Sequence, residues 1–170
     1  IRIADVAHEF SDIPGVREDV IRLMLQIKQL RLKLYDVDTA RLHLEIRGSG
    51  VVTAGDIITP PEVDIVNPDL YLFTVDDNDA HFEMEMTVER GRGYSPADDR
   101  IGHLPIGELP VDAIYSPVKR VNWDVSNARV GQSTNFDRLN LEIWTDGTIG
   151  PEEALSSSAK IVIDHLRHIA

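Results

Sequence analysis

The chain has 170 residues, of which 42% are hydrophobic and 27% charged, values typical of one globular domain or two small ones. It contains no cysteine, which excludes disulfide bonds and thiolate metal sites, and no apolar run approaches the 18 residues of a membrane-spanning helix. The net charge of −12 argues against direct binding of nucleic acid, because phosphate binding requires a basic surface.

The first part of the chain predicts one helix among short strands. Residues 1–6 alternate like a strand, and a turn follows at residues 12–15. The next segment predicts a helix that ends near Leu30, in which Lys28 lies near the C-terminal end, where the helix dipole favours a cation. Its apolar residues recur at intervals of three and four: Val16, Val20, Leu23, Met24, Ile27 and Leu30.

Extended segments follow this helix. Short strands are predicted at residues 31–35 and 41–47, and a further extended segment at residues 51–57. Strict alternation then predicts a hairpin of residues 71–75 and 80–89, joined across the acidic residues 76–79. This connection lacks the central glycine and the final glutamate of a calcium-binding loop, so the sequence favours a plain turn.

The last third of the chain predicts two strands and a helix after an irregular segment at residues 95–110. A strand, or a strand with a bend, is expected at residues 115–130, and another at residues 136–144, with Leu139, Leu141 and Ile143 inward. Pro151 suits the first position of a helix. This helix has more apolar surface than one small sheet would cover. A second helix or a second copy of the chain could cover the surplus, and a broad core face within one chain is the alternative.

A glycine-rich stretch interrupts the alternation after residue 89. It consists of Arg90, Gly91, Arg92, Gly93 and Tyr94, called the glycine loop below. Glycine permits backbone conformations and close approaches that a side chain forbids, arginine offers forked donors, and tyrosine offers a flat amphipathic face. The loop is interpreted as a presented contact surface, and an ordinary strand exit with solvated arginines is the alternative.

No catalytic constellation emerges from the sequence. There is no cysteine and no GxSxG motif for a nucleophile. His165 and His168 have the spacing to share a metal ion with Asp164, but no further ligand stands at a recognisable spacing, so solvated histidines are favoured. We therefore predict no catalytic residue, no metal site and no cofactor.

Several segments together resemble the N-terminal domain of the alpha subunit of bacterial-type RNA polymerase. They are VERGRGYSPA at residues 88–97, LPIG at 104–107, the stretch at 111–121, and TDGTIGPEEA at 145–154. The resemblance covers essentially the whole chain and implies an α+β fold with two subdomains. Residues 1–114 would form a mixed, strand-rich insert domain. Residues 115–170 would form the C-terminal half of the dimerisation domain, with two strands and a long helix.

The resemblance implies a non-catalytic assembly scaffold in transcription, part of a DNA-directed RNA polymerase, which is a nucleotidyltransferase complex. Two alpha chains would pair, and the pair would recruit the beta and beta-prime subunits. It also implies Lys28 and Val111 as beta-prime docking positions, and the glycine loop as a large-subunit contact. The helix after Pro151 would carry the dimer interface, whose predicted residues are Leu155, Ala159, Val162 and Leu166.

The acidic charge predicts no direct contact with nucleic acid, the lack of a long apolar run predicts no contact with a membrane, and the resemblance implies a place in the cytoplasm or the plastid stroma. The sequence opens in mid-pattern without methionine, so we expect a fragment that lacks the family's first N-terminal segment and its C-terminal domain. Loss of the first segment would put dimerisation in doubt. The competing hypothesis is a free-standing module that binds a small anionic ligand at the glycine loop.

Overall fold

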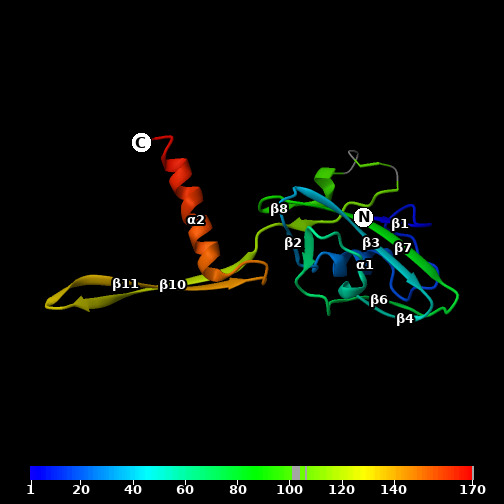
Figure 1. The fold of residues 1–170 in the computed structure, drawn as a ribbon, viewed down its shortest axis with the longest axis horizontal. Coiled ribbons are helices and arrows are strands. Elements are labelled where there is room, and N and C mark those ends of the chain that lie inside the picture. Colours follow the sequence, from blue (N-terminus) through cyan, green and yellow to red (C-terminus); the bar gives the residue numbers. More distant parts are fainter. Residues whose placement is uncertain (101–103, 106, 170) are drawn as a thin grey trace. The chain divides into compact units, whose positions relative to one another are not determined.

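The computed structural model describes residues 1–100, 104–105 and 107–169, and it divides into two compact units, residues 1–115 and 116–170 (Figure 1). Both units combine strands with a helix, so the predicted α+β fold class is confirmed. Neither helix of the described residues is long and apolar enough to cross a membrane.

The first unit surrounds one helix, α1 (Val20–Ile27), with short antiparallel strands. The strands are β1 (Arg2–Ile3), β2 (Leu32–Leu34), β3 (Thr39–Arg47), β4 (Gly50–Thr53), β5 (Val63–Ile65), β6 (Tyr71–Val75), β7 (His81–Glu89), β8 (Tyr94–Ser95) and β9 (Ala113–Ile114). They form one sheet in the order β1-β7-β3 and three pairs, β2-β5, β4-β6 and β8-β9. Two 3-10 turns, η1 (Ala54–Asp56) and η2 (Ala97–Arg100), complete the unit.

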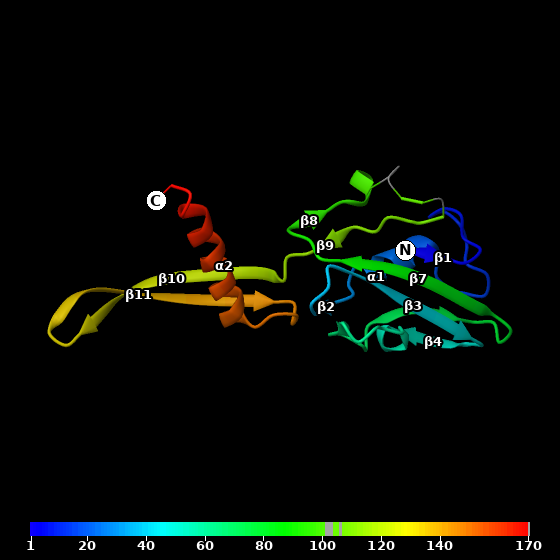
Figure 2. The same cartoon turned by 45° about the horizontal axis from the view of Figure 1, so that its top comes forward.

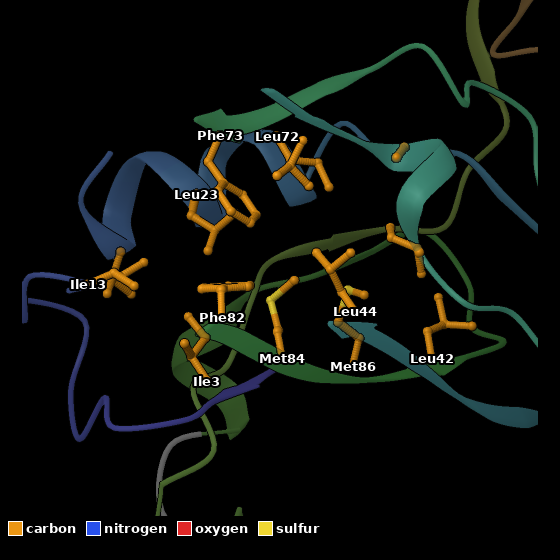
Figure 3. Packing of buried hydrophobic residues seen from close by; sticks show 14 of the residues in the cluster. Ile3, Ile13, Leu23, Leu42, Leu44, Leu72, Phe73, Phe82, Met84 and Met86 are labelled. Atoms are coloured by element: carbon orange, nitrogen blue, oxygen red, sulfur yellow. The ribbon is translucent and has the colours of Figure 1, made fainter. Parts of the chain in front are cut away.

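The core of the first unit lies between the β1-β7-β3 sheet on one side and α1 with β6 on the other (Figure 3). Alternate residues of β7, including Phe82 and Met84, face Leu23 and Phe73 across this core. The rings of Phe73 and Phe82 lie 4.5 Å apart between centroids and are tilted by 51°. The core therefore joins the sheet to the opposite layer through side chains, as the alternation in β7 requires.

The predicted hairpin of residues 71–75 and 80–89 is wrong, although both strands exist. β6 pairs with β4, whereas β7 pairs with β1 and β3. Phe73 and Phe82 contact each other across the core from opposing layers, and not as neighbours within one sheet.

The helix starts later than the apolar spacing predicts. Val16 forms a β-bridge with Val75 instead of the first helical turn. Asp19 caps the helix, and its side chain accepts a hydrogen bond from the backbone N–H of Arg22 at 2.7 Å. The predicted position of Lys28 is confirmed, because this residue is the C-cap.

The second unit consists of a long hairpin and one helix (Figure 2). The hairpin pairs β10 (Val118–Val130) with β11 (Ser133–Thr145), and the register shifts between Val118 and Arg120 and between Ala128 and Val130. β10 is one continuous strand, and the two register shifts are local irregularities in its pairing. The helix α2 (Pro151–Leu166) begins at Pro151, as the sequence predicts.

The second unit has almost no core of its own. Ala154 is its single buried residue among residues 116–169. Leu139 and Leu141 are exposed and Ile143 is half-buried, so the prediction that they face inward is wrong for this chain by itself. Period-two patterning identifies a face that suits burial, but it does not say which element covers that face.

Candidate protein-docking surfaces

The glycine loop is folded against the ring of Tyr115. A Cβ atom on Gly91 would lie 2.4 Å from this ring, so the position needs glycine, and Gly93 adopts a φ of +67°. The Tyr115 hydroxyl donates to Glu89 at 2.8 Å, and its backbone N–H donates to the Gly93 carbonyl at 2.8 Å. Tyr115 therefore stabilises the shape of the glycine loop by packing on Gly91 and hydrogen bonding to Gly93.

The two arginines of the glycine loop have different roles. The guanidinium of Arg90 donates to the Leu34 carbonyl at 2.8 Å, and its backbone N–H donates to the Asp38 carbonyl at 2.8 Å. Arg90 thus ties the loop to the end of β2. Arg92 is exposed and has no hydrogen-bond or ion-pair partner within the described ranges. Arg92 is the better candidate for an interface anchor, and the Arg90 assignment stays a prediction.

Lys28 and Tyr94 are distant in sequence but lie together where α1 ends. The Lys28 ammonium donates to Oδ2 of Asp112 at 2.7 Å and lies 5.7 Å from the centre of the Tyr94 ring. Oδ1 of Asp112 accepts from the backbone N–H of Ala97 at 2.8 Å. We call these four residues the Asp112 cluster. Val111 directly precedes Asp112 in the sequence, and its side chain is half-buried.

The Asp112 cluster keeps its charges paired. The Lys28 hydrogen bond, followed by that of Ala97, lowers the pKa of Asp112 to about 2. The same contact with Asp112 raises the pKa of Lys28 above its ordinary value. Burial, followed by a hydrogen bond with Asp112, raises the pKa of the Tyr94 phenol. The ammonium and the carboxylate are therefore both ionised at neutral pH and compensate each other.

Apolar side chains continue this surface along α1. Ile21 and Leu25 precede Lys28 by seven and three residues, positions that share one face of a helix, and both are exposed. Neither residue was among the site residues predicted from the sequence. The spacing of Ile21, Leu25 and Lys28 was the available signal, since it falls outside the buried stripe of the same helix.

The second unit presents an apolar surface of a different kind. One face of the hairpin gathers exposed or half-buried residues that lie opposite one another in the register: Val121, Trp123, Val125, Leu139, Leu141 and Ile143. The other face is polar along most of its length and contains the Asn122–Glu142 hydrogen bond at 3.3 Å. At one end Arg120 lies 3.7 Å from the centre of the Trp144 ring. An amphipathic hairpin with an uncovered apolar face suits docking to another polypeptide.

The predicted dimer-interface residues lie on α2. Leu155, Ala159, Val162 and Leu166 are all exposed, and Ile161 and Ile163 enlarge the apolar surface. Their assignment to a dimer stays a prediction, but their side chains are available to a neighbour.

Little in the described chain resembles a reaction centre. Among residues 1–100, 104–105 and 107–169, no three histidine, aspartate or glutamate side chains are arranged to hold a metal ion. One ring nitrogen of His165 lies 2.8 Å from the Ile161 carbonyl, within its own helix. The hypothesis of a metal site at His165 and His168 gains no support.

Comparisons with known proteins give consistent matches. The family model described as RNA polymerase Rpb3/RpoA insert domain matches residues 1–116. Proteins named DNA-directed RNA polymerase subunit alpha from Roseiflexus castenholzii and from another Roseiflexus are 54% identical over 170 residues, the whole of this chain and 52% of each relative. The protein of that name from Desulforudis audaxviator is 52% identical over 168 residues, which are 98% of this chain and 53% of the relative. The chain spans about half the length of these curated relatives, and the resemblance stated from the motifs is confirmed.

Proposed function

The chain belongs to the RNA polymerase Rpb3/RpoA insert-domain family, and from this premise we propose that it is a non-catalytic assembly subunit of a DNA-directed RNA polymerase in transcription. In this proposal two copies pair, and the pair recruits the beta and beta-prime subunits, which carry the nucleotidyltransferase chemistry. The cytoplasm or the plastid stroma is the proposed compartment.

The uncovered apolar surface of the second unit carries this proposal. Trp123 is 71% exposed and Leu139 60% exposed, although both lie on the apolar face of a regular hairpin. Each Å² of apolar surface removed from water contributes about 25 cal/mol, so a protein neighbour on this face would stabilise the unit substantially. A scaffold that works by association accounts for such a surface.

In the first unit, the large-subunit docking surface of the proposal consists of Lys28, Arg92, Tyr94 and Val111. Tyrosine and arginine are enriched at protein interfaces and among the residues that dominate binding energy. Gly91 and Gly93 shape this surface without contributing side chains, and Arg90 attaches the glycine loop to Leu34 at the end of β2. The competing hypothesis of a module that binds a small anion at the glycine loop requires both arginines to face the anion. Arg90 instead donates to the Leu34 carbonyl, which disfavours that hypothesis.

Co-purification of the tagged chain with co-expressed beta and beta-prime subunits tests the proposal. The informative variant combines Arg92→Ala with Tyr94→Ala and should reduce recovery of a large subunit. Arg41→Ala is the matched control, because Arg41 is an exposed arginine on β3 outside the docking surface. Equal recovery with both variants would remove Arg92 and Tyr94 from the surface. Failure of the wild-type chain to recover either large subunit would contradict the scaffold role.

A further inference from the structure

Asp112 connects three segments of the first unit through one carboxylate. Its Oδ2 accepts from Lys28 at the end of α1, and its Oδ1 accepts from the backbone N–H of Ala97, just after β8. Asp112 itself directly precedes β9. The two strands β8 and β9 pair over only two residues each, so they supply little hydrogen bonding of their own. The carboxylate therefore supplements a weak strand pair.

The Lys28 ammonium donates a hydrogen bond to Asp112, so its charge is compensated within the cluster. The side chains of Lys28 and Asp112 are each 30% exposed, so the ion pair is partly removed from water. Hydrogen bonds between ionised partners are shorter and stronger than neutral ones, which favours a single geometry. The Tyr94 ring lies 5.7 Å from the same ammonium and shares in fixing it.

Two of the side chains that a partner would meet at this place are aromatic or apolar. Tyr94 is 56% exposed and Leu25 is 55% exposed, and both adjoin the cluster through Lys28. The paired charges of Lys28 and Asp112 leave Tyr94 and Leu25 to provide the contact at this place, beside Arg92. Contact between the Lys28 ammonium and an acidic partner side chain would compete with the ion pair to Asp112.

We propose that Asp112 is the positioning residue of the large-subunit docking surface, and that Lys28 acts through Asp112 and Tyr94 rather than by contacting the partner with its charge. The partner segment is then one of the large polymerase subunits, with apolar rather than acidic side chains facing Tyr94 and Leu25. The inference rests on the proposed function for the identity of this partner. The arrangement of the surface itself is a property of the free chain.

A double-mutant cycle between Lys28→Met and Asp112→Ala separates positioning from direct contact. Dissociation constants for the large subunits are measured with the co-expressed proteins at low and high salt. If Asp112 positions the surface, each single variant weakens binding about tenfold, and the double variant is no weaker than Asp112→Ala alone, because residues that act as a unit are not additive. This agreement between the double variant and Asp112→Ala should hold at both salt concentrations, because Lys28 then makes no contact with a charge on the partner.

Direct contact by Lys28 predicts a different pattern. Asp112→Ala would then leave binding unchanged or strengthen it by releasing the ammonium, and adding Lys28→Met to Asp112→Ala would weaken binding further, less so at high salt. Either result would overturn the inference. Asp112→Asn serves as the second variant if Asp112→Ala does not fold, because the amide oxygen can still accept from Ala97 while the ion pair is lost. It should weaken binding in the same direction.

Hydrogen exchange in the free chain provides a readout that does not depend on the polymerase. The backbone N–H of Ala97 should exchange about tenfold faster in Asp112→Ala than in the wild type, while amides in β7 keep their protection. Unchanged exchange at Ala97 would refute the positioning role even if docking is impaired. If the wild-type chain does not bind the large subunits, the proposed function fails, and the exchange result still decides whether Asp112 holds this segment.

Discussion

Replacing Gly91 by alanine tests whether the glycine loop has the structure described for it. The added Cβ would lie 2.4, 2.5 and 2.6 Å from three atoms of the Tyr115 ring. Carbon atoms in contact are ordinarily about 3.5–4.0 Å apart, so the overlap is about 1 Å or more at each atom. Tyr115 cannot move away easily, because its hydroxyl donates to Glu89 and its backbone N–H donates to the Gly93 carbonyl. Overpacking of this kind costs about 1–3 kcal/mol.

This cost can be measured by urea unfolding of the first unit, which contains almost all of the buried core. Followed by far-UV circular dichroism, Gly91→Ala should lower the urea midpoint of the first unit by about 1 M. Gly50→Ala is the control, because nothing lies within 4 Å of its added Cβ. Equal midpoints for the two variants would refute the packing of Gly91 on Tyr115.

Two further predictions concern the core and the Asp112 cluster. Phe73→Ala should destabilise the first unit by about 3–5 kcal/mol in urea, because Phe73 is fully buried, whereas Phe10→Ala should change it by less than about 0.5 kcal/mol, because Phe10 is 77% exposed. Equal effects would contradict the assigned core. The pKa of Asp112 is lowered from 3.8 to about 2, so its contribution to stability is complete above about pH 4 and is lost as the pH falls through 2. Acid unfolding followed by circular dichroism should show this dependence between pH 4 and 2, and Asp112→Asn should flatten it; an identical profile for Asp112→Asn would contradict it.

The periodicity of the sequence identifies which residues are buried more reliably than it identifies their neighbours. Phe82 and Met84 are buried on one face of β7, as their alternation predicts. The partners of β7 are instead set by packing across the core, which no local pattern records. The helix start was misplaced for a similar reason. Glu18 is not part of the helix, because its carboxylate accepts from the backbone N–H of Thr74 at 2.8 Å and from the Tyr71 hydroxyl.

The candidate surface shows the same limit. The two glycines stand out in the sequence because glycine is unusual within a strand pattern, and Tyr94 directly follows the second of them. The roles of Arg90 and Asp112 depend on Leu34, Lys28 and Ala97, which are remote in the chain, so sequence spacing could not reveal them.

Sedimentation velocity of the chain mixed with purified beta and beta-prime subunits tests the central claim most directly. A scaffold predicts that the 19.0 kDa chain leaves its own boundary and sediments with the large subunits as a complex containing two copies. A chain that sediments at its own mass in the presence of both large subunits would contradict the account.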